Sequence, residues 1–121
     1  MVTNNILESV KAECGISIDS DNTAFDDQLI DSINTVVMAL DQMNVGTKGF
    51  IMVDGTETWD QLIPDPVKYP GIKTYVKVKT HMLFDPKSFT PNTMKSAEEV
   101  LREIEWRLNY KADAEEHGLI T

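Results

Sequence analysis

Residue types that support metal binding or catalysis are scarce in this chain and are not grouped. The two histidines, His81 and His117, lie far apart, and neither has metal-ligand spacing with the single cysteine, Cys14, so no Cys/His metal site can be written. There is no glycine-rich phosphate loop and no nucleophile elbow. The carboxylates fall on predicted helix faces beside basic residues. We therefore favour solvated helix faces over a pair of carboxylates that act as catalytic acid and base. We therefore expect no catalytic residue, no cofactor and no enzymatic activity, and we expect Cys14 to be a small buried hydrophobe.

One acidic stretch has the alternation of a calcium-binding loop. Asp19, Asp21 and Thr23 occupy alternating positions, as oxygen ligands do in such loops. Ala24, however, stands where the loop needs a glycine, and Ile30 stands where it needs a bidentate glutamate. The segment is better explained as a polar cap at the positive end of the following helix, and we expect no metal site.

A basic cluster stands out in an otherwise acidic protein: Lys68, Lys73, Lys77 and Lys79. In one interpretation these four lysines form a solvated face, and the apolar stems of their side chains cover apolar surface. In the other they contact the acidic half of a neighbouring copy, and such a contact between unlike patches is head-to-tail and closes into a ring if the rotation permits. The second interpretation predicts a ring interface formed by Lys68, Lys73, Lys77 and Lys79 with Asp26, Asp27 and Asp31.

The negative charge is concentrated in the first half of the chain. The net charge is −9; residues 1–60 hold 11 acidic and two basic residues, whereas residues 61–121 hold nine of each. Binding to nucleic acid depends on lysine and arginine neutralising phosphates, so this half would repel DNA rather than hold it. No apolar run approaches the roughly 20 residues that span a bilayer. The first residues do not form a basic region followed by an apolar one, so we expect no secretory signal. A single cysteine excludes an intramolecular disulfide.

The chain is organised around residues 72–109, which we interpret as two helices joined at Asp85-Pro86. The first part, 73–79, alternates like a strand, but the apolar residues of the longer run fit a helical face, and we favour a helix. Thr90 and Pro91 have the residue types of a helix start. The second helix carries an apolar stripe at 94, 97, 101, 104 and 108. Trp106 lies off this stripe. A tryptophan in this position is more often at the edge of the core than in a contact with another protein.

The earlier part of the chain predicts two further helices and an irregular segment. The first is short, capped by Asn5 and stopped at Gly15, and the second spans about 23–44. Residues 49–55 predict a short strand or an ordered loop, and 58–63 predict one helical turn. The fold class is therefore all-α: a bundle of about four helices over 1–110, with a loop or short β-hairpin at 46–58. Residues 111–121 form a tail that we expect to become ordered on a partner.

Together these motifs resemble a known family. The run 72–86 with its Phe-Asp-Pro break, followed by Glu-Trp-Arg-Leu within 103–109, is similar to the head–tail connector (adaptor or head-completion) proteins of long-tailed double-stranded DNA bacteriophages and prophages. The opening of the long helix at 25–31 resembles them too. The similarity spans roughly residues 5–110 and is weaker at 46–71.

The resemblance implies a structural protein of the virion neck that forms a ring under the portal, with the portal's symmetry. Such a ring extends the channel, through which genomic DNA passes without specific binding, and gives the stopper or tail-completion protein a platform. In this family the C-terminal segment commonly engages the portal, which implies contacts by Tyr110, Leu119 and Ile120. The loop and the residue that follows it would then face the stopper, through Phe50, Met52 and Trp59. The alternative is a small helical regulatory module that binds one protein in the host cell.

Overall fold

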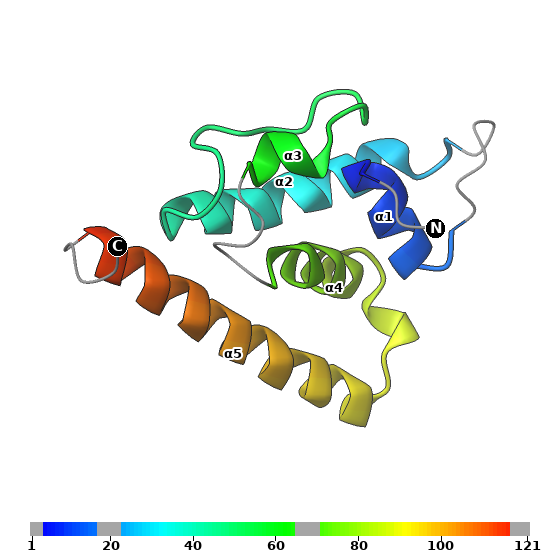
Figure 1. The fold of residues 1–121 in the computed structure, drawn as a ribbon. Helices are drawn as coiled ribbons and strands as arrows, with labels where there is room; N and C mark the ends of the chain where they lie inside the picture. The colour runs from blue at the N-terminus through cyan, green and yellow to red at the C-terminus, as the bar shows by residue number, and fades with distance from the viewer. Residues whose placement is uncertain (1–3, 17–22, 65–70, 117–121) are drawn as a thin grey trace.

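The computed structural model describes residues 4–16, 23–64 and 71–116, and describes side chains as far as residue 110. Five α-helices and one 3-10 turn follow in order: α1 (Ile6–Glu13), α2 (Asp26–Gln42), α3 (Trp59–Leu62), α4 (Ile72–Phe84), η1 (Pro86–Ser88) and α5 (Pro91–Glu116) (Figure 1). The described residues form no strand, and a single antiparallel bridge joins Asn5 to Thr58. The all-α prediction is confirmed, and of the two alternatives for 46–58 the loop is correct.

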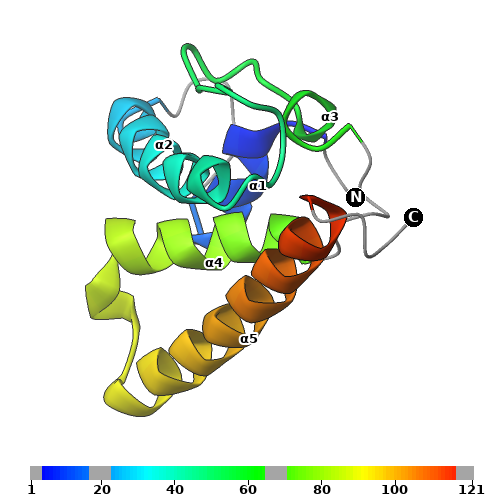
Figure 2. The ribbon, with the colours of Figure 1, turned by 90° about the vertical axis from the view of Figure 1, so that its left-hand side faces the viewer.

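Helix α4 is the centre of the bundle. Helices α1 and α2 pack against one side of α4, and α5 packs against the other side (Figures 1 and 2). The segment 43–58 crosses over α2, on the side of α2 that faces away from α5 (Figure 1). The molecule therefore has three layers: the α1/α2 layer with its loop, the central α4, and α5.

The core fills the space between these layers with aliphatic side chains and two aromatic ones. Trp59 and Tyr75 are its largest fully buried side chains. Helix α2 contributes Leu29, Ile33, Val36, Val37 and Leu40, a helical stripe with the predicted spacing. Helix α5 contributes only Leu101 and Leu108 as buried residues among its described side chains. Because α5 buries such a narrow stripe, most of its surface remains in solvent.

The helix ends follow from local chemistry. Asn5 caps α1, with its Oδ1 accepting from the Glu8 N–H at 2.8 Å, and Gly15 follows the helix with a φ of +74°. The start of α2 differs from the prediction: it begins at Asp26, and Phe25 gives it no side-chain cap. Residues 19–22 of the predicted polar cap lie outside the described residues.

The break at Asp85-Pro86 also has the predicted form. Helix α4 ends at Phe84, one 3-10 turn follows, and α5 starts with Pro91 behind Thr90. The Thr90 Oγ1 accepts from the Thr93 N–H at 3.1 Å, which satisfies one free donor of the first turn. Residues 73–79 are helical.

Helix α5 is longer than the sequence predicts. It continues through residue 116 and so crosses the predicted boundary between the domain and the tail at residue 110. No glycine or proline occurs between Pro91 and Gly118, and without either residue the backbone has no local reason to leave the helix.

Candidate interaction surfaces

The loop 46–58 is tied to α2 by one side chain. The Nδ2 of Asn34 donates to the Met52 carbonyl oxygen at 3.0 Å, and the Met52 N–H donates to the Asn34 Oδ1 at 2.7 Å. An amide side chain has one donor and one acceptor side, so Asn34 satisfies both backbone groups of Met52 as a neighbouring strand would. The loop is therefore held at its middle, not only at its ends.

A second set of hydrogen bonds shapes the turn that follows. The carboxylate of Glu57 accepts from the N–H groups of Val53 at 2.8 Å and Gly55 at 3.0 Å. Asp54 Oδ1 accepts from both the hydroxyl and the N–H of Thr56, and these bonds lower the pKa of the Asp54 carboxyl. Gly55 has a φ of +87°, and a Cβ there would lie 2.7 Å from Leu7 Cδ2. The turn thus requires glycine both for its backbone conformation and for space.

This anchoring decides which apolar residues of the loop face solvent. Met52 is buried beneath the loop, whereas Ile51 and Val53 on either side of it are 60% and 73% exposed. The hydrogen bonds from Asn34 hold the Met52 backbone against α2, and the side chains on either side of Met52 remain in solvent. Two neighbouring branched aliphatic side chains are therefore displayed on a well-supported loop.

The predicted stopper-facing residues occupy different environments. Phe50 is half-buried, but Met52 and Trp59 belong to the core, and the Trp59 indole N–H donates to Ser9 Oγ at 3.0 Å. Neither of the two buried side chains is available to a partner at the surface. Ile51 and Val53 are the exposed residues that sequence reasoning missed; because Ile51, Met52 and Val53 are all apolar, the sequence pattern does not distinguish the buried residue from the exposed ones.

Beside the loop lies a hollow on the outer face of α2. It has a volume of about 370 Å³, and its lining is Asn34, Thr35, Met38, Asp41, Gly49, Phe50 and Ile51. Met38 is 57% exposed although it is a large apolar residue. The carboxylate of Asp41 also lines the hollow, and one of its oxygens accepts from the Gly49 N–H at 3.3 Å.

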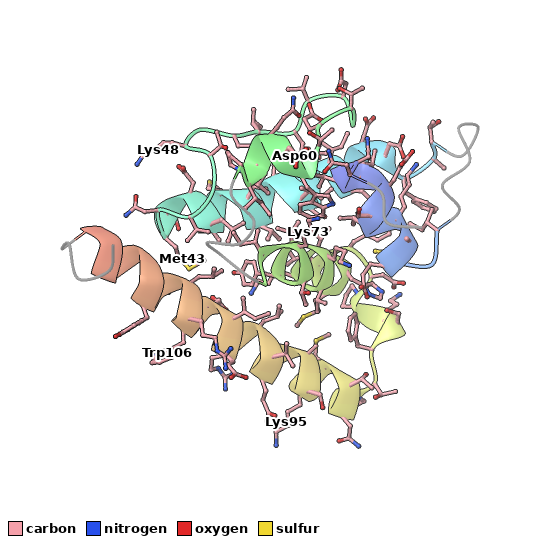
Figure 3. All side chains as sticks on the ribbon, viewed as in Figure 1. Met43, Lys48, Asp60, Lys73, Lys95 and Trp106 are labelled. Carbon is pink, nitrogen blue, oxygen red and sulfur yellow. The ribbon has the colours of Figure 1, made fainter. Side chains whose placement is uncertain are left out.

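The outer face of α5 carries two aromatic side chains. Trp106 and Tyr110 are 65% and 63% exposed, and their rings stack with centroids 5.7 Å apart and planes inclined by 16°. Trp106 points away from the rest of the molecule (Figure 3). The core-edge interpretation of Trp106 is therefore wrong. Large exposed aromatic residues are typical of protein contacts.

Not all of the lysines predicted to form one patch share a face: Lys73 and Lys77 are four residues apart on α4 and lie on one side of it, but Lys79 does not. The Lys73 ammonium lies 5.8 Å from the centre of the Trp59 ring, a cation–π contact. Lys79 lines a groove between α4 and α5 together with Glu98 and Glu105. Lys77 and Lys79 are two residues apart, so about 200° separates them around the helix axis. The single-cluster prediction is wrong for Lys79, and Lys68 lies outside the described residues.

The acidic partners predicted for these lysines also differ from one another. Asp26 forms an ion pair with the buried Lys11 within the same chain, at 2.6 Å, so its charge is already compensated. Asp27 and Asp31 are exposed and four residues apart on α2, which places them on one face. Of the predicted contact, Lys73 and Lys77 on one side and Asp27 and Asp31 on the other remain accessible.

Two titratable groups, the partly buried Cys14 and the buried Tyr75, have raised pKa values. Burial, with Glu13 and Asp85 nearby, raises the pKa of the Cys14 thiol to about 11. Burial, together with the charge of Glu105 and a hydrogen bond to it, raises the pKa of the Tyr75 hydroxyl to about 12. Tyr75 lies on α4 and Glu105 on α5, so this electrostatic interaction acts across the interface of the two helices.

The described part of the chain contains neither a grouped metal site nor a membrane-spanning helix. Among the described side chains, at residues 4–16, 23–64 and 71–110, no three His, Cys, Asp or Glu are grouped so that they could hold a metal ion. Within the same ranges, no helix combines the length and the apolar character that crossing a bilayer requires.

The fold and its surfaces define a small all-α protein with exposed apolar residues on two opposite sides of a central helix. Residues 6–115 match the family described as phage connector protein, and the chain belongs to this family. The family indicated by the sequence motifs is thereby confirmed. No curated protein matches the chain, and no solved structure does.

Proposed function

We propose that this protein is a structural component of the phage neck, where it forms a ring between the portal and the stopper or tail-completion protein. The ring completes the head and extends the channel through which DNA is packaged and ejected. The observation that carries this proposal is the match to the phage connector family over residues 6–115. The family supports a head–tail connector role; the ring, the channel and the named partners are the proposal.

The surfaces of the molecule suit a protein held between several neighbours. Tyr110 is exposed near the end of α5 and is proposed to contact the portal together with Leu119 and Ile120, which lie beyond the described residues. On the far side of the bundle, Val53 is 73% exposed at the tip of the loop, and this tip is proposed to face the stopper. Because side-chain hydrogen bonds hold the loop in place, little conformational entropy would be lost on binding there.

The charge distribution supports a channel that does not bind DNA. Helix α2 contains four aspartates and no basic residue, and residues 1–60 carry a net charge of −9. With only two basic residues among residues 1–60, this part of the chain has few groups that could hold phosphates by releasing counterions, so DNA would slide past it.

We further propose that the protein acts without catalysis. The raised pKa of Cys14 supports this, because the thiolate rather than the thiol is the nucleophile. The phenol of Tyr75 is likewise kept protonated and is buried in the core, where it has no access to a substrate.

The proposal is tested by electron microscopy of this protein mixed with the portal protein of the same phage. We expect a closed ring on one face of the portal. Charge reversal at Lys73 and Lys77 should weaken the ring at low ionic strength if these lysines meet Asp27 and Asp31 of the next copy, whereas Lys95→Glu on the first turns of α5 serves as the matched control. A portal that remains undecorated by the unmodified protein would refute the proposed function.

The alternative function is a helical module that binds a single host protein. The exposed Trp106–Tyr110 stack favours it, because one aromatic anchor is enough for a binary complex. Gene neighbours that encode portal, capsid and tail proteins, or co-purification with a portal, would support the neck. Neighbours of another kind and recovery with one host protein would support the alternative.

A further inference from the structure

Two unlike surfaces lie on opposite sides of the molecule. Trp106 projects from α5, which forms one outer layer, and the hollow lies on α2 and its loop, which form the other (Figures 1 and 3). Helix α4 separates the two layers (Figure 2). A subunit that joins identical copies head-to-tail needs this arrangement, because each copy must offer one patch and receive the other.

The two surfaces agree in size and polarity. The hollow of about 370 Å³ is larger than one indole side chain, and much of its wall is apolar, with Met38, Phe50 and Ile51. Trp106 is supported from one side by its stack on Tyr110, which restricts its rotamers before any contact forms. An aromatic residue ordered in advance loses less entropy when it enters a pocket.

The two surfaces also differ in charge. Asp41 lines the hollow, on a helix that has no basic residue. Glu99, Arg102 and Glu103 lie beside Trp106, and Arg107 is paired with Glu103 at 2.8 Å, so the surface around Trp106 is balanced in charge whereas the hollow carries only an acid. This ion pair is highly exposed, and such pairs contribute little to stability, so Arg107 can exchange its partner at small cost. Arg102 and Arg107 thus provide positive groups for an acidic rim.

We propose that Trp106 of one copy inserts into the hollow between α2 and residues 49–51 of the next copy. This inference rests on the proposed ring and names its apolar contact. Arg102 or Arg107 then lies against Asp41 at the rim, and repetition of the contact generates the ring. Symmetric stacking of two Trp106 side chains would instead leave the hollow empty and stop at a dimer.

Two variants and one control test the contact through sedimentation velocity. Trp106→Ala removes the inserted side chain, and Met38→Glu places a charge in the hollow; both positions are exposed in the single chain, so both variants should fold. We expect each to raise the dissociation constant of self-association at least about tenfold. Val100→Ala is the control, because Val100 is an exposed apolar residue on another face of α5 and should leave assembly unchanged.

Mixing the two variants separates a head-to-tail contact from a symmetric one. The Trp106→Ala protein keeps an intact hollow, and the Met38→Glu protein keeps an intact tryptophan. An equimolar mixture should therefore form a 1:1 complex that does not grow, although each variant alone stays monomeric. Absence of the 1:1 complex, or assembly of Met38→Glu at the unmodified affinity, would overturn the inference.

Tryptophan fluorescence gives an independent readout, because Trp59 is buried and Trp106 is mostly exposed in the single chain. Acrylamide should quench Trp106 in the monomer and lose access to it in the assembly. If the free protein stays monomeric, the same variants are mixed with the portal protein, and ring formation on the portal is measured by electron microscopy. Rings formed equally well by both variants would overturn this contact and leave the proposed function standing, whereas a portal that the unmodified protein never decorates would overturn both.

Discussion

Asn34 is the residue whose replacement most directly tests how the loop is held. Asn34→Ala removes both hydrogen bonds to the Met52 backbone, at 3.0 and 2.7 Å. It leaves an N–H and a carbonyl without their partner in a partly buried place. A hydrogen bond of this kind contributes about 1 kcal/mol net, so we expect the free energy of unfolding to fall by about 2 kcal/mol. For a chain of this length that corresponds to about 8 °C in the melting temperature.

Urea unfolding followed by circular dichroism measures this loss, and native-state hydrogen exchange of the Met52 amide localises it. Thr35→Ala is the matched control: Thr35 is the exposed neighbour on α2, and its hydroxyl bonds only to the Asp31 carbonyl of the same helix. We expect its effect to stay within about 0.5 kcal/mol. If Asn34→Ala unfolds at the unmodified urea concentration and the Met52 amide remains as protected as before, the loop is held by something other than this side chain.

Three further predictions follow from the turn and the two perturbed groups. Gly55→Ala should lower the free energy of unfolding by about 1–3 kcal/mol. The control is Gly49→Ala, because Gly49 has a similar φ but a Cβ there would have no atom within 4 Å, and this change should cost less. Equal losses in the two variants would exclude a steric contribution from Leu7. With a pKa of about 11, Cys14 should react with Ellman's reagent at pH 8 about a hundredfold more slowly than a thiol of pKa 9, and urea should remove the difference; a fast reaction in the folded protein would contradict the burial. The pKa of Tyr75 is raised from 10 to about 12, so the folded state holds this proton more tightly than the unfolded state does. Stability should therefore fall as pH rises from about 10 to about 12, and Tyr75→Phe should remove this loss in urea titrations.

The exposed apolar residues have a common physical explanation. Met38, Ile51, Val53 and Trp106 remain largely in solvent after the core is complete. A single exposed apolar residue needs no explanation, but aromatic and aliphatic groups that are held in place by hydrogen bonds or stacking retain binding energy for a partner. The buried core is formed without these side chains, which leaves them accessible for contacts with other proteins.

The helices, and the helix ends that caps or proline set, were accessible from the sequence because they depend on neighbours along the chain. Asn5 caps the residues that directly follow it, and the Asp85-Pro86 break acts on its own backbone. The apolar stripe of α2 was equally readable, since helical spacing alone brings its members to one side. The family could be recognised for the same reason, because its motifs are short runs around these local features.

The surfaces were decided by contacts between distant parts of the chain. Met52 turns inward because Asn34, 18 residues earlier, binds its backbone, and Trp59 is buried where Ser9, 50 residues earlier, meets its indole. Trp106 remains outside because α5 covers α4 with a narrow stripe only. The sequence by itself therefore determined the all-α class, the helix boundaries set by caps and proline, and the family. For apolar residues outside the regular helical stripes, such as Met52, Trp59 and Trp106, only the tertiary structure decided between core and surface, because residues of similar type differ there in which elements pack over them.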